Sequence, residues 1–418
     1  MPRLFDEPGL CCGCQSCLEA CPTGAIGLTE DGHGFTYPVI DVEKCIGCGR
    51  CKRVCGFQRG LGQQSRGPFY AAATEEAEIM ESSSGGVFGA LARALVERGG
   101  VVFGCALDQW ADGIHVRHRP ARTKSELKGL YGSKYVQSSS AGCYRKVERA
   151  LRAGRDVLFS GTPCQVAGLK GFLGREYDGL LTVDIVCHGV PSERMLRDYL
   201  TLTLPDREII DVRFRGKRNG WNGSRELELI CSNGDSRDIS CDESSYYDLF
   251  YDCMLSRDSC YECPFAGALR PADLSLGDFW GIEKVRPDLL ADAGGPFDVR
   301  RGVSCLLVNN ERGEAWLERL GQRLVTAPVT FGQIAEHNDQ LQGPPGARPI
   351  LTRLRRAAGL RSSGCGVAPC AVGGCWEPSS AACPRRSSAR SSARWADEAA
   401  GARRSRRPRC PALPGPSR

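Results

Sequence analysis

Two groups of four cysteines near the N-terminus repeat one spacing, C-x2-C-x2-C-x3-C. The first group is Cys11, Cys14, Cys17 and Cys21, with Cys12 left over as an expected non-ligand. The second group is Cys45, Cys48, Cys51 and Cys55. Three thiolates of such a tight loop bind three corners of an iron–sulfur cubane, and the fourth cysteine, about one helical turn later, reaches the other cubane. The repeat therefore predicts two [4Fe-4S] clusters.

Exchange of the fourth cysteine between the two groups assigns the ligands of each cluster. We expect the first cluster on Cys11, Cys14, Cys17 and Cys55. We expect the second on Cys45, Cys48, Cys51 and Cys21. A pair of zinc knuckles is the alternative, which the internal repeat and the Cys21-Pro22 step disfavour. Over residues 8–57 the stretch resembles the bacterial two-cluster ferredoxins, which implies a small α+β ferredoxin-like domain that transfers single electrons.

Four more cysteines lie where ligands or nucleophiles are common. Residues 161–165 read Gly-Thr-Pro-Cys-Gln after a predicted strand, so Cys164 lies near a helix N-terminus, which lowers the pKa of a thiol. Cys187 follows a continuous apolar strand, and the carboxyl ends of strands in α/β folds are where ligands bind. Cys260 and Cys263 form a C-x2-C pair before Pro264, which is half a metal site.

These four cysteines together predict a third [4Fe-4S] cluster. Cys253 competes with Cys187 for the fourth position. A zinc site, a redox dithiol and a nucleophilic Cys164 are alternatives that the spacing leaves open.

Polar turns supply further candidates for chemistry. Ser83-Ser84-Gly85-Gly86 precedes a helix and suits a phosphate, although a plain N-cap would have the same sequence. Lys134 lies in a Gly/Ser turn, where it could contact a phosphate or a flavin edge, or be a solvated loop lysine. His188 could donate a proton or cap the turn after its strand. Phe214-Arg215-Gly216-Lys217 and Trp221 bring two cations beside an aromatic ring.

The elements that must position these residues alternate between the two periodicities. Strands are predicted at 69–74, 101–107, 115–119, 156–160, 180–186 and 303–309, and a hairpin at 225–240. Helices are predicted from 87 to just before Gly99 and at 144–153, 246–255 and 313–324. The pattern indicates a larger mixed α/β domain after the ferredoxin-like one.

The domain boundaries follow from changes in composition. We expect a two-cluster domain at 1–58, a linker at 59–68, the two parts of the larger domain at 69–150 and 151–350, and a disordered tail at 351–418. Residues 361–418 contain 11 Arg, three acidic residues, five irregular cysteines and no lysine. No core can form from such a segment, and we interpret it as a frameshifted reading frame.

Composition also excludes several classes of protein. Without the tail, the remaining 360 residues hold 44 basic and 46 acidic side chains, so a nucleic-acid binder is not expected. No run of eighteen apolar residues predicts a membrane span. Residues 1–10 lack a signal-type apolar core, so a cytoplasmic protein is expected, in which 24 cysteines indicate metal ligation rather than disulfides.

In their order along residues 69–350, the motifs resemble the coenzyme F-420 hydrogenase/dehydrogenase beta-subunit family. The matching stretches are 83–86, 132–135, 161–165, 187–192, 214–221, 260–263 and 273–280. The resemblance implies an FAD-binding α/β domain with its own [4Fe-4S] cluster on Cys164, Cys187, Cys260 and Cys263. It also implies a flavin site lined by Ser84, Gly85, Gly86, Lys134, Gly161, Thr162 and His188, with His188 and Lys134 as the catalytic candidates. No G-x-G-x-x-G fingerprint supports a Rossmann-type site.

The leading hypothesis is an iron–sulfur flavoprotein oxidoreductase. Electrons would pass between the clusters and FAD, and a hydride to or from an organic acceptor, such as the deazaflavin coenzyme F-420 of the namesake members. The expected partners are a small-molecule hydride acceptor and a ferredoxin, or a hydrogenase- or dehydrogenase-like protein or subunit. The alternatives are a non-catalytic electron-transfer subunit of a larger redox complex and a sulfur-handling protein with Cys164 as nucleophile.

Overall fold

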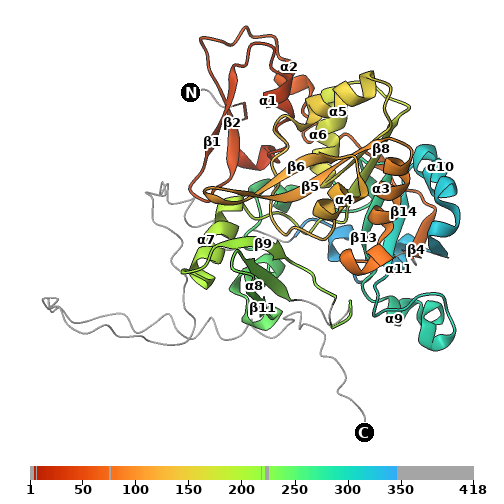
Figure 1. Ribbon diagram of the computed structural model, residues 1–418. Coiled ribbons are helices and arrows are strands. Elements are labelled where there is room, and N and C mark those ends of the chain that lie inside the picture. Colours follow the sequence, from red (N-terminus) through yellow and green to blue (C-terminus); the bar gives the residue numbers. More distant parts are fainter. Residues whose placement is uncertain (1–3, 6, 75–76, 218, 222–225, 346–418) are drawn as a thin grey trace, which may run out of the picture. The chain divides into compact units, whose positions relative to one another are not determined.

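The larger part of the chain is built on an eight-stranded mixed sheet (Figure 1). The computed structural model describes residues 4–5, 7–74, 77–217, 219–221 and 226–345, all within one unit that spans Met1–Gly364. The predicted disordered tail lies outside the described residues. In sheet order the strands are β15 (Val325–Val329), β4 (Phe69–Ala73), β14 (Ser304–Val308), β13 (Leu274–Asp278), β8 (Leu180–Ile185), β7 (Val157–Gly161), β5 (Val101–Trp110) and β6 (Gly113–Ala121).

The centre of this sheet is parallel. β5 pairs with β7, β7 with β8 and β8 with β13 in parallel, whereas β6, β14, β4 and β15 pair antiparallel. Parallel neighbours end at the same edge, so the residues that follow β7, β8 and β13 emerge side by side. This topology brings the turn with Cys164 next to the turn with Cys187, as the apolar strand at 180–186 predicted.

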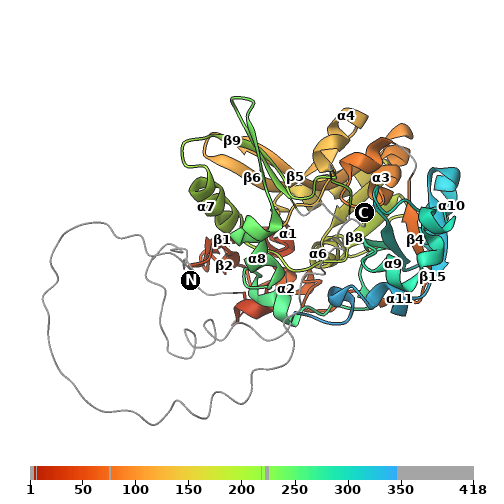
Figure 2. The same cartoon turned by 90° about the horizontal axis from the view of Figure 1, so that it is seen from below.

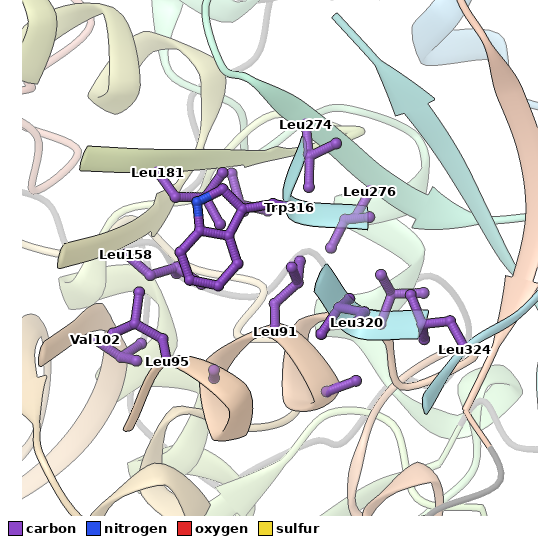
Figure 3. Close-up of a cluster of buried hydrophobic side chains, with 14 of the residues drawn as sticks. Leu91, Leu95, Val102, Leu158, Leu181, Leu274, Leu276, Trp316, Leu320 and Leu324 are labelled. Carbon is purple, nitrogen blue, oxygen red and sulfur yellow. The ribbon is translucent and has the colours of Figure 1, made fainter. Parts of the chain in front are cut away.

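Helices cover both faces of the sheet. α3 (Val87–Glu97) and α10 (Glu311–Leu320) cover one face, where Leu91, Trp316 and Leu320 pack against strand residues (Figure 3). α5 (Cys143–Arg152) and α6 (Pro163–Leu173) cover the other. Side chains of a strand alternate between the faces, so Val102 of β5 joins the first cluster and Val101 and Phe103 join the second. Burial on both faces accounts for the continuous apolar sequence of β8.

A second, three-stranded sheet contains β9 (Ile209–Arg213), β10 (Leu227–Cys231) and β11 (Ser236–Ile239). The predicted hairpin is formed by β10 and β11, with Ile230 opposite Ser236. α7 (Glu193–Thr203) and α8 (Ser245–Tyr251) complete this layer, which packs against β6. In both views it lies at the other end of the large sheet from α10 (Figure 1 and Figure 2).

α8 ends at Tyr251, four residues before the predicted end at Leu255. Cys253 has a left-handed φ of 56°, which no α-helix continues. His188 also contacts the carbonyl oxygens of Phe250 and Tyr251, at 3.1 and 3.3 Å from its Nε2. The helix is therefore terminated by a contact from a distant strand end, which local periodicity does not reveal.

The N-terminal cysteines belong to a small α+β domain. Its elements are α1 (Ser16–Ala20), the antiparallel pair β1 (Ile26–Glu30) and β2 (Thr36–Ile40), and α2 (Arg50–Arg53). Residues 59–68, expected as a linker, include β3 (Gln63–Gln64), which pairs with β12 (Leu269–Arg270). The remaining helices are α4 (Lys124–Leu127), α9 (Ile282–Val285) and α11 (Phe331–Ala335). Across the described residues, no helix combines the length and the apolarity that crossing a membrane requires.

Glycines let this domain approach α6 backbone to backbone. A Cβ on Gly56 would lie 2.0 Å from the carbonyl oxygen of Ala167, and a Cβ on Gly171 would lie 2.3 Å from that of Val54. A Cβ on Gly168 would lie 2.8 Å from the sulfur of Cys14. The domain is therefore packed tightly onto the helix that begins beside Cys164.

Candidate redox centre

The four cysteines expected to hold the first cluster lie together, and we call them the inner group: Cys11, Cys14, Cys17 and Cys55. Cys11, Cys14 and Cys55 are buried, and Cys17 is partly buried. Burial raises the pKa of Cys55 to about 11, and the neighbouring Cys14 and Cys11 add to the shift. Burial raises the pKa of Cys17 too, again with contributions from Cys14 and Cys11. Bringing negative thiolates together in a dry site is unfavourable unless a cation compensates them.

The cysteines expected to hold the second cluster form the outer group: Cys45, Cys48, Cys51 and Cys21. Cys45 and Cys48 are exposed, and Cys51 and Cys21 are partly buried. The pKa of Cys51 is raised by burial first, then by Cys48 and Cys45, so these three are neighbours. The sulfur of Cys21 accepts a hydrogen bond from the Ala25 amide at 3.2 Å. Cys21 and Arg50, the first residue of α2, line one pocket.

The third group is Cys164, Cys187, Cys260 and Cys263. Burial raises the pKa of both Cys187 and Cys263 to about 12, and Cys164 is the next contributor to each. Cys260 also interacts with the other three. Cys253, the competitor of Cys187, instead has its sulfur 3.2 Å from the Nε2 of His188. The structure thus brings Cys187 into the group and directs Cys253 elsewhere.

Cys164 lies in the first turn of α6. Capping residues determine where this helix begins and where it ends. Thr162 and Gln165 form a reciprocal capping box, Pro163 is the first helical residue, and Gly174 ends the helix with φ of 64°. The pKa of Cys164 is lowered to about 7, chiefly by a hydrogen bond from Cys12 and then by Thr162, whose Oγ1 lies 3.1 Å from the sulfur. Metal ligation requires a thiolate, so this environment favours the ligand state.

Cys12 connects the inner group to the third group. Its thiol is in hydrogen-bonding contact with the sulfurs of Cys14 and Cys164, and these contacts, together with burial, hold the pKa of Cys12 well above its ordinary value. Its carbonyl oxygen accepts a hydrogen bond from Gln137 Nε2 at 2.9 Å. No sequence pattern indicates this role, because Cys12 only interrupts the ferredoxin spacing.

A fully buried cation, Arg257, lies at the same junction. Its Nε donates to the carbonyl oxygen of Cys11 at 2.8 Å, and its guanidinium lies 3.8 Å from the sulfur of Cys11 and 4.2 Å from the ring centre of Tyr37. No carboxylate of the described residues forms an ion pair with Arg257. A buried charge requires a counter-charge, and here only thiolates, or the anionic clusters they would hold, can supply it. The donor set and this cation therefore fit bound iron–sulfur clusters.

Sequence reasoning did not single out Arg257. It precedes the 3-10 turn Asp258–Glu262, which carries Cys260. The only sequence feature that marks Arg257 is its position three residues before a C-x2-C pair. An exposed arginine could occupy the same position.

Arg270 fixes the loop of the third group to the end of β8. Its guanidinium pairs with Asp184 and donates to the carbonyl oxygens of Phe265 and Ile185 at 3.0 and 2.8 Å. Both members of the pair are buried. Phe265 follows the Cys263-Pro264 step, so the ion pair holds Cys263 in reach of Cys187.

Asp184→Asn is expected to destabilise the protein by about 3–5 kcal/mol, because it leaves the Arg270 guanidinium buried without its counter-charge. Glu148→Gln is the matched control, since Glu148 pairs with Arg152 on the exposed face of α5 and such pairs contribute about 0.3–0.5 kcal/mol. Urea denaturation of both variants measures the difference. Equal midpoints would show that the Asp184 pair does not hold the loop.

The serine–glycine turn predicted for the flavin site is tied to the sheet. Ser84 Oγ donates to the carbonyl oxygen of Val303 at 3.0 Å, and the Gly85 amide donates to Ser304 Oγ at 2.9 Å. Gly86 has φ of 80° and precedes α3 directly, so the turn presents the N-terminus of an eleven-residue helix. Ser83 Oγ accepts from the Ser133 amide at 2.6 Å, which joins this turn to the turn of Lys134.

The two catalytic candidates both make contacts within the fold. Lys134 Nζ donates to the carbonyl oxygens of Tyr131, Gly132 and Gly129 at 2.6, 3.2 and 3.3 Å, and burial lowers its pKa. His188 Nδ1 contacts Gln340 Nε2, and burial lowers the pKa of His188. Nε2 of His188 thus contacts the end of α8 and Nδ1 contacts Gln340. Roles for Lys134 and His188 in proton or hydride chemistry stay predictions.

Gly161 and Thr162 lie beside the third group, at the junction of β7 and α6. A Cβ on Gly161 would lie 3.1 Å from both Gln165 Oε1 and His118 Nε2, so a side chain at this position would crowd both groups. Thr162 helps to lower the pKa of Cys164 through the contact described above. Their part in cofactor binding stays a prediction.

A second set of polar groups faces the serine–glycine turn. Lys217 donates to the carbonyl oxygens of Ile79 at 2.7 Å and Ser84, and burial lowers its pKa to about 7. Trp221 stacks on Trp280 with the ring centres 4.9 Å apart. The buried Nε of Arg215 has no hydrogen-bond partner in the described part of the chain. Arg215 also pairs with Asp278 at 3.4 Å and lies 4.9 Å from the ring centre of Trp280. A free N–H beside stacked indoles fits a flat cofactor that bears oxygen acceptors, such as FAD.

A single metal ion needs a different arrangement of ligands from the one that a [4Fe-4S] cluster needs. No three His, Cys, Asp or Glu side chains of the described residues are gathered closely enough to hold one ion. A [4Fe-4S] cluster instead takes one thiolate at each of four iron corners.

Comparison with known proteins finds two matching regions in this chain. Residues 154–330 match the family described as the C terminus of the coenzyme F420 hydrogenase/dehydrogenase beta subunit. Residues 10–58 match the 4Fe-4S dicluster domain. The chain therefore carries, at residues 154–330, a region of the C-terminal family of the F420 hydrogenase/dehydrogenase beta subunit, and a 4Fe-4S dicluster domain precedes it. The family resemblance inferred from the motifs is confirmed.

Curated relatives match only short parts of the chain. A subunit of the H(2):CoB-CoM heterodisulfide,ferredoxin reductase from Methanothermobacter marburgensis is 35% identical over 91 residues, 19% of this chain and 12% of the relative. A tetrathionate reductase subunit from Archaeoglobus fulgidus is 40% identical over 57 residues, 13% of this chain and 26% of the relative. The chain thus spans about an eighth to a quarter of the length of these relatives.

Among solved structures, the xenon-derivatised F420-reducing [NiFe] hydrogenase complex from Methanosarcina barkeri contains a similar chain. The TM-score is 0.45 and the identity 16%, over 72% of this chain and 95% of that chain. We draw no functional conclusion from a likeness at this level.

Proposed function

We propose that the chain is an iron–sulfur flavoprotein oxidoreductase that passes electrons between [4Fe-4S] clusters and FAD and exchanges a hydride with an organic acceptor. The observation that carries this proposal is the arrangement of three cysteine groups in one packed unit. The inner and third groups are in contact through Cys12, which touches a predicted ligand of each. Electron transfer requires donor and acceptor to lie close together, and this contact supplies that proximity.

The protein's own residues would prepare these sites in three ways. When bound, [4Fe-4S] clusters supply one-electron transfer. Hydrogen-bonding contacts with Cys12 and Thr162 lower the pKa of Cys164 and favour its thiolate. Arg257 offsets negative charge at the inner group, and Arg270 holds the loop of Cys263 against β8. Hydrogen bonds and charges around the sulfurs are the means by which proteins set cluster potentials.

The proposed flavin site rests on the N-terminus of α3 and on Arg215. When bound, FAD supplies the conversion between one-electron and hydride transfer. Ser84, Gly85 and Gly86 present the helix start, where backbone N–H groups favour phosphate. The unpartnered Nε of Arg215 has a hydrogen bond to offer an anionic or carbonyl oxygen. The family name supports a deazaflavin such as coenzyme F-420 as the hydride acceptor.

A non-catalytic electron-transfer subunit of a larger redox complex is the second candidate. It is favoured by the partial relatives, whose names describe them as subunits, one of a heterodisulfide,ferredoxin reductase and one of a tetrathionate reductase. Such a subunit would bind clusters without turning over a hydride acceptor by itself.

Anaerobic purification with iron, sulfide and flavin quantified tests the proposal. We expect about twelve irons, at four per cluster, and one FAD per chain. About eight irons without flavin would contradict the proposed function. A chain that holds all of its iron and FAD but neither oxidises nor reduces coenzyme F-420 would favour the second candidate, the non-catalytic electron-transfer protein.

A further inference from the structure

The outer cysteine group lies at the protein surface, in contrast to the inner group. Cys45 and Cys48 are exposed, and the loop between them carries Ile46, which is 68% exposed. Val42, four residues earlier, is 64% exposed. Val42 and Ile46, which lie on either side of the predicted ligand Cys45 in sequence, form a small exposed apolar patch next to the site of the second cluster.

Basic side chains of α2 lie close to this patch in sequence. Arg50, Lys52 and Arg53 of α2 are all exposed. Arg53 also donates to the carbonyl oxygen of Cys48 at 2.9 Å, so its charge is fixed beside the predicted ligands. Two acids lie nearby: Asp41 is paired with Lys44 at 2.7 Å, and Glu43 is exposed. The four basic side chains Lys44, Arg50, Lys52 and Arg53 outnumber these two acids, so the surroundings of the patch carry a net positive charge.

The positive surface continues from α2 onto α5, which lies at the same end of the protein (Figure 1). A pocket of about 460 Å³ is lined by Cys21, by Arg50, Arg145 and Arg149, and by two acids, Glu19 and Glu148. Glu19 is turned toward the protein, because it accepts from the amides of Tyr144 and Arg145 at 3.3 and 2.9 Å. A second pocket of about 470 Å³ shares Arg149 and adds only basic charges. These are Arg122, Lys146 and Arg155.

We propose that the outer group is the input port of the electron route and that its partner is an acidic one-electron carrier protein. The inference rests on the proposed function, because it requires clusters in the outer and inner groups. Complementary charge steers such a carrier to the port, and the small apolar centre gives a contact of the short-lived kind. Electrons would enter at the outer group, pass to the inner group and leave it past Cys12 toward the third group.

A preference for an acidic partner distinguishes this electron-entry site from a surface that would exchange electrons with any redox protein. A carrier must approach closely and leave again, which a small apolar centre with a charged rim allows. The body of the chain outside residues 361–418 is slightly acidic, so a basic face is a local feature rather than the average of the surface.

The test uses the full chain with its iron reconstituted anaerobically and a reduced plant-type [2Fe-2S] ferredoxin, an acidic protein, as the probe. Stopped-flow absorbance measures the bimolecular rate of electron transfer. The double variant Arg50→Glu with Lys52→Glu is expected to lower this rate by at least about tenfold at low ionic strength, with the difference disappearing at high salt. The control reverses two exposed charges elsewhere, Arg98→Glu with Arg237→Glu, and is expected to leave the rate within about twofold of the unaltered chain.

Iron content and reduction by dithionite are measured on every variant. If the unaltered chain holds fewer than about eight irons, at four per cluster, the proposed function fails and the port fails with it. If the irons are complete, a double variant that reacts as fast as the control overturns the port alone. A basic cytochrome that reacts as fast as the acidic probe, or RNA that binds the basic face and competes with the probe, also overturns it.

Discussion

Arg257→Met is expected to lower the reduction potential of the inner [4Fe-4S] cluster by on the order of 60–130 mV, which corresponds to about 1.5–3 kcal/mol for a hydrogen bond to a charged group in a one-electron couple. The sign follows from charge. Reduction adds an electron to an already anionic cluster, and the buried guanidinium beside Cys11 favours that added charge. Methionine fills similar space without the charge, so the reduced state loses its stabilisation.

A redox titration followed by electron paramagnetic resonance measures this shift. The outer cluster serves as an internal control, because Arg257 contacts the inner group and the potential of the outer cluster should change by far less. Arg257→Lys keeps the charge but not the planar fork that reaches Cys11, Thr36 and Gln137, so its potential should fall between those of the unaltered chain and Arg257→Met. An unchanged inner potential in a variant with full iron content would refute the role given to Arg257.

Cys260→Ser is expected to remove about four irons per chain, because each [4Fe-4S] cluster depends on its set of four thiolates. Loss of the third cluster should also disconnect FAD from the ferredoxin-type clusters, so that electrons supplied at the outer group no longer reach the flavin. Iron analysis and flavin absorbance under a ferredoxin reductant measure the two effects. Cys187→Ser should behave in the same way.

Cys253→Ser is the matched control for this prediction. Cys253 is partly buried and close in sequence, but its sulfur contacts His188 rather than the other cysteines. The variant should therefore keep all of its iron. The reverse result, with iron lost from Cys253→Ser and retained in Cys187→Ser, would exchange the two residues in the ligand set. Retention of iron in Cys164→Ser would return Cys164 to the nucleophile hypothesis.

Much of the architecture could be predicted because it depends on local pattern. The continuous apolar runs at the start of β5 and in β8 reflect burial on both faces of the sheet, and both runs are visible in sequence. The capping residues Thr162 and Gln165 act within one helical turn. The ferredoxin spacing encodes two clusters because its cysteines lie within tight loops.

The remaining features depend on contacts between distant segments. Cys12 and Arg257 gain their importance only when the N-terminal domain packs on α6 and on the loop of Cys260, and neither has a spacing that would indicate it. The early end of α8 is set by His188, which lies 62 residues from Phe250 in sequence. Likewise, Gln63 and Gln64 have a linker-like composition, yet they pair with β12.

The glycine contacts between the dicluster domain and α6 determine the kinetic order of the electron route. A carrier on a flexible tether would have to find its acceptor again in each cycle, at a rate set by its effective concentration. Here the backbones of Gly56 and Gly171 lie against those of Ala167 and Val54, so the inner group is held beside the third group, its proposed acceptor. The step between them is then unimolecular and independent of dilution and salt. Among the steps that would bring electrons to the third group, only the encounter at the outer group then depends on the concentration of the carrier.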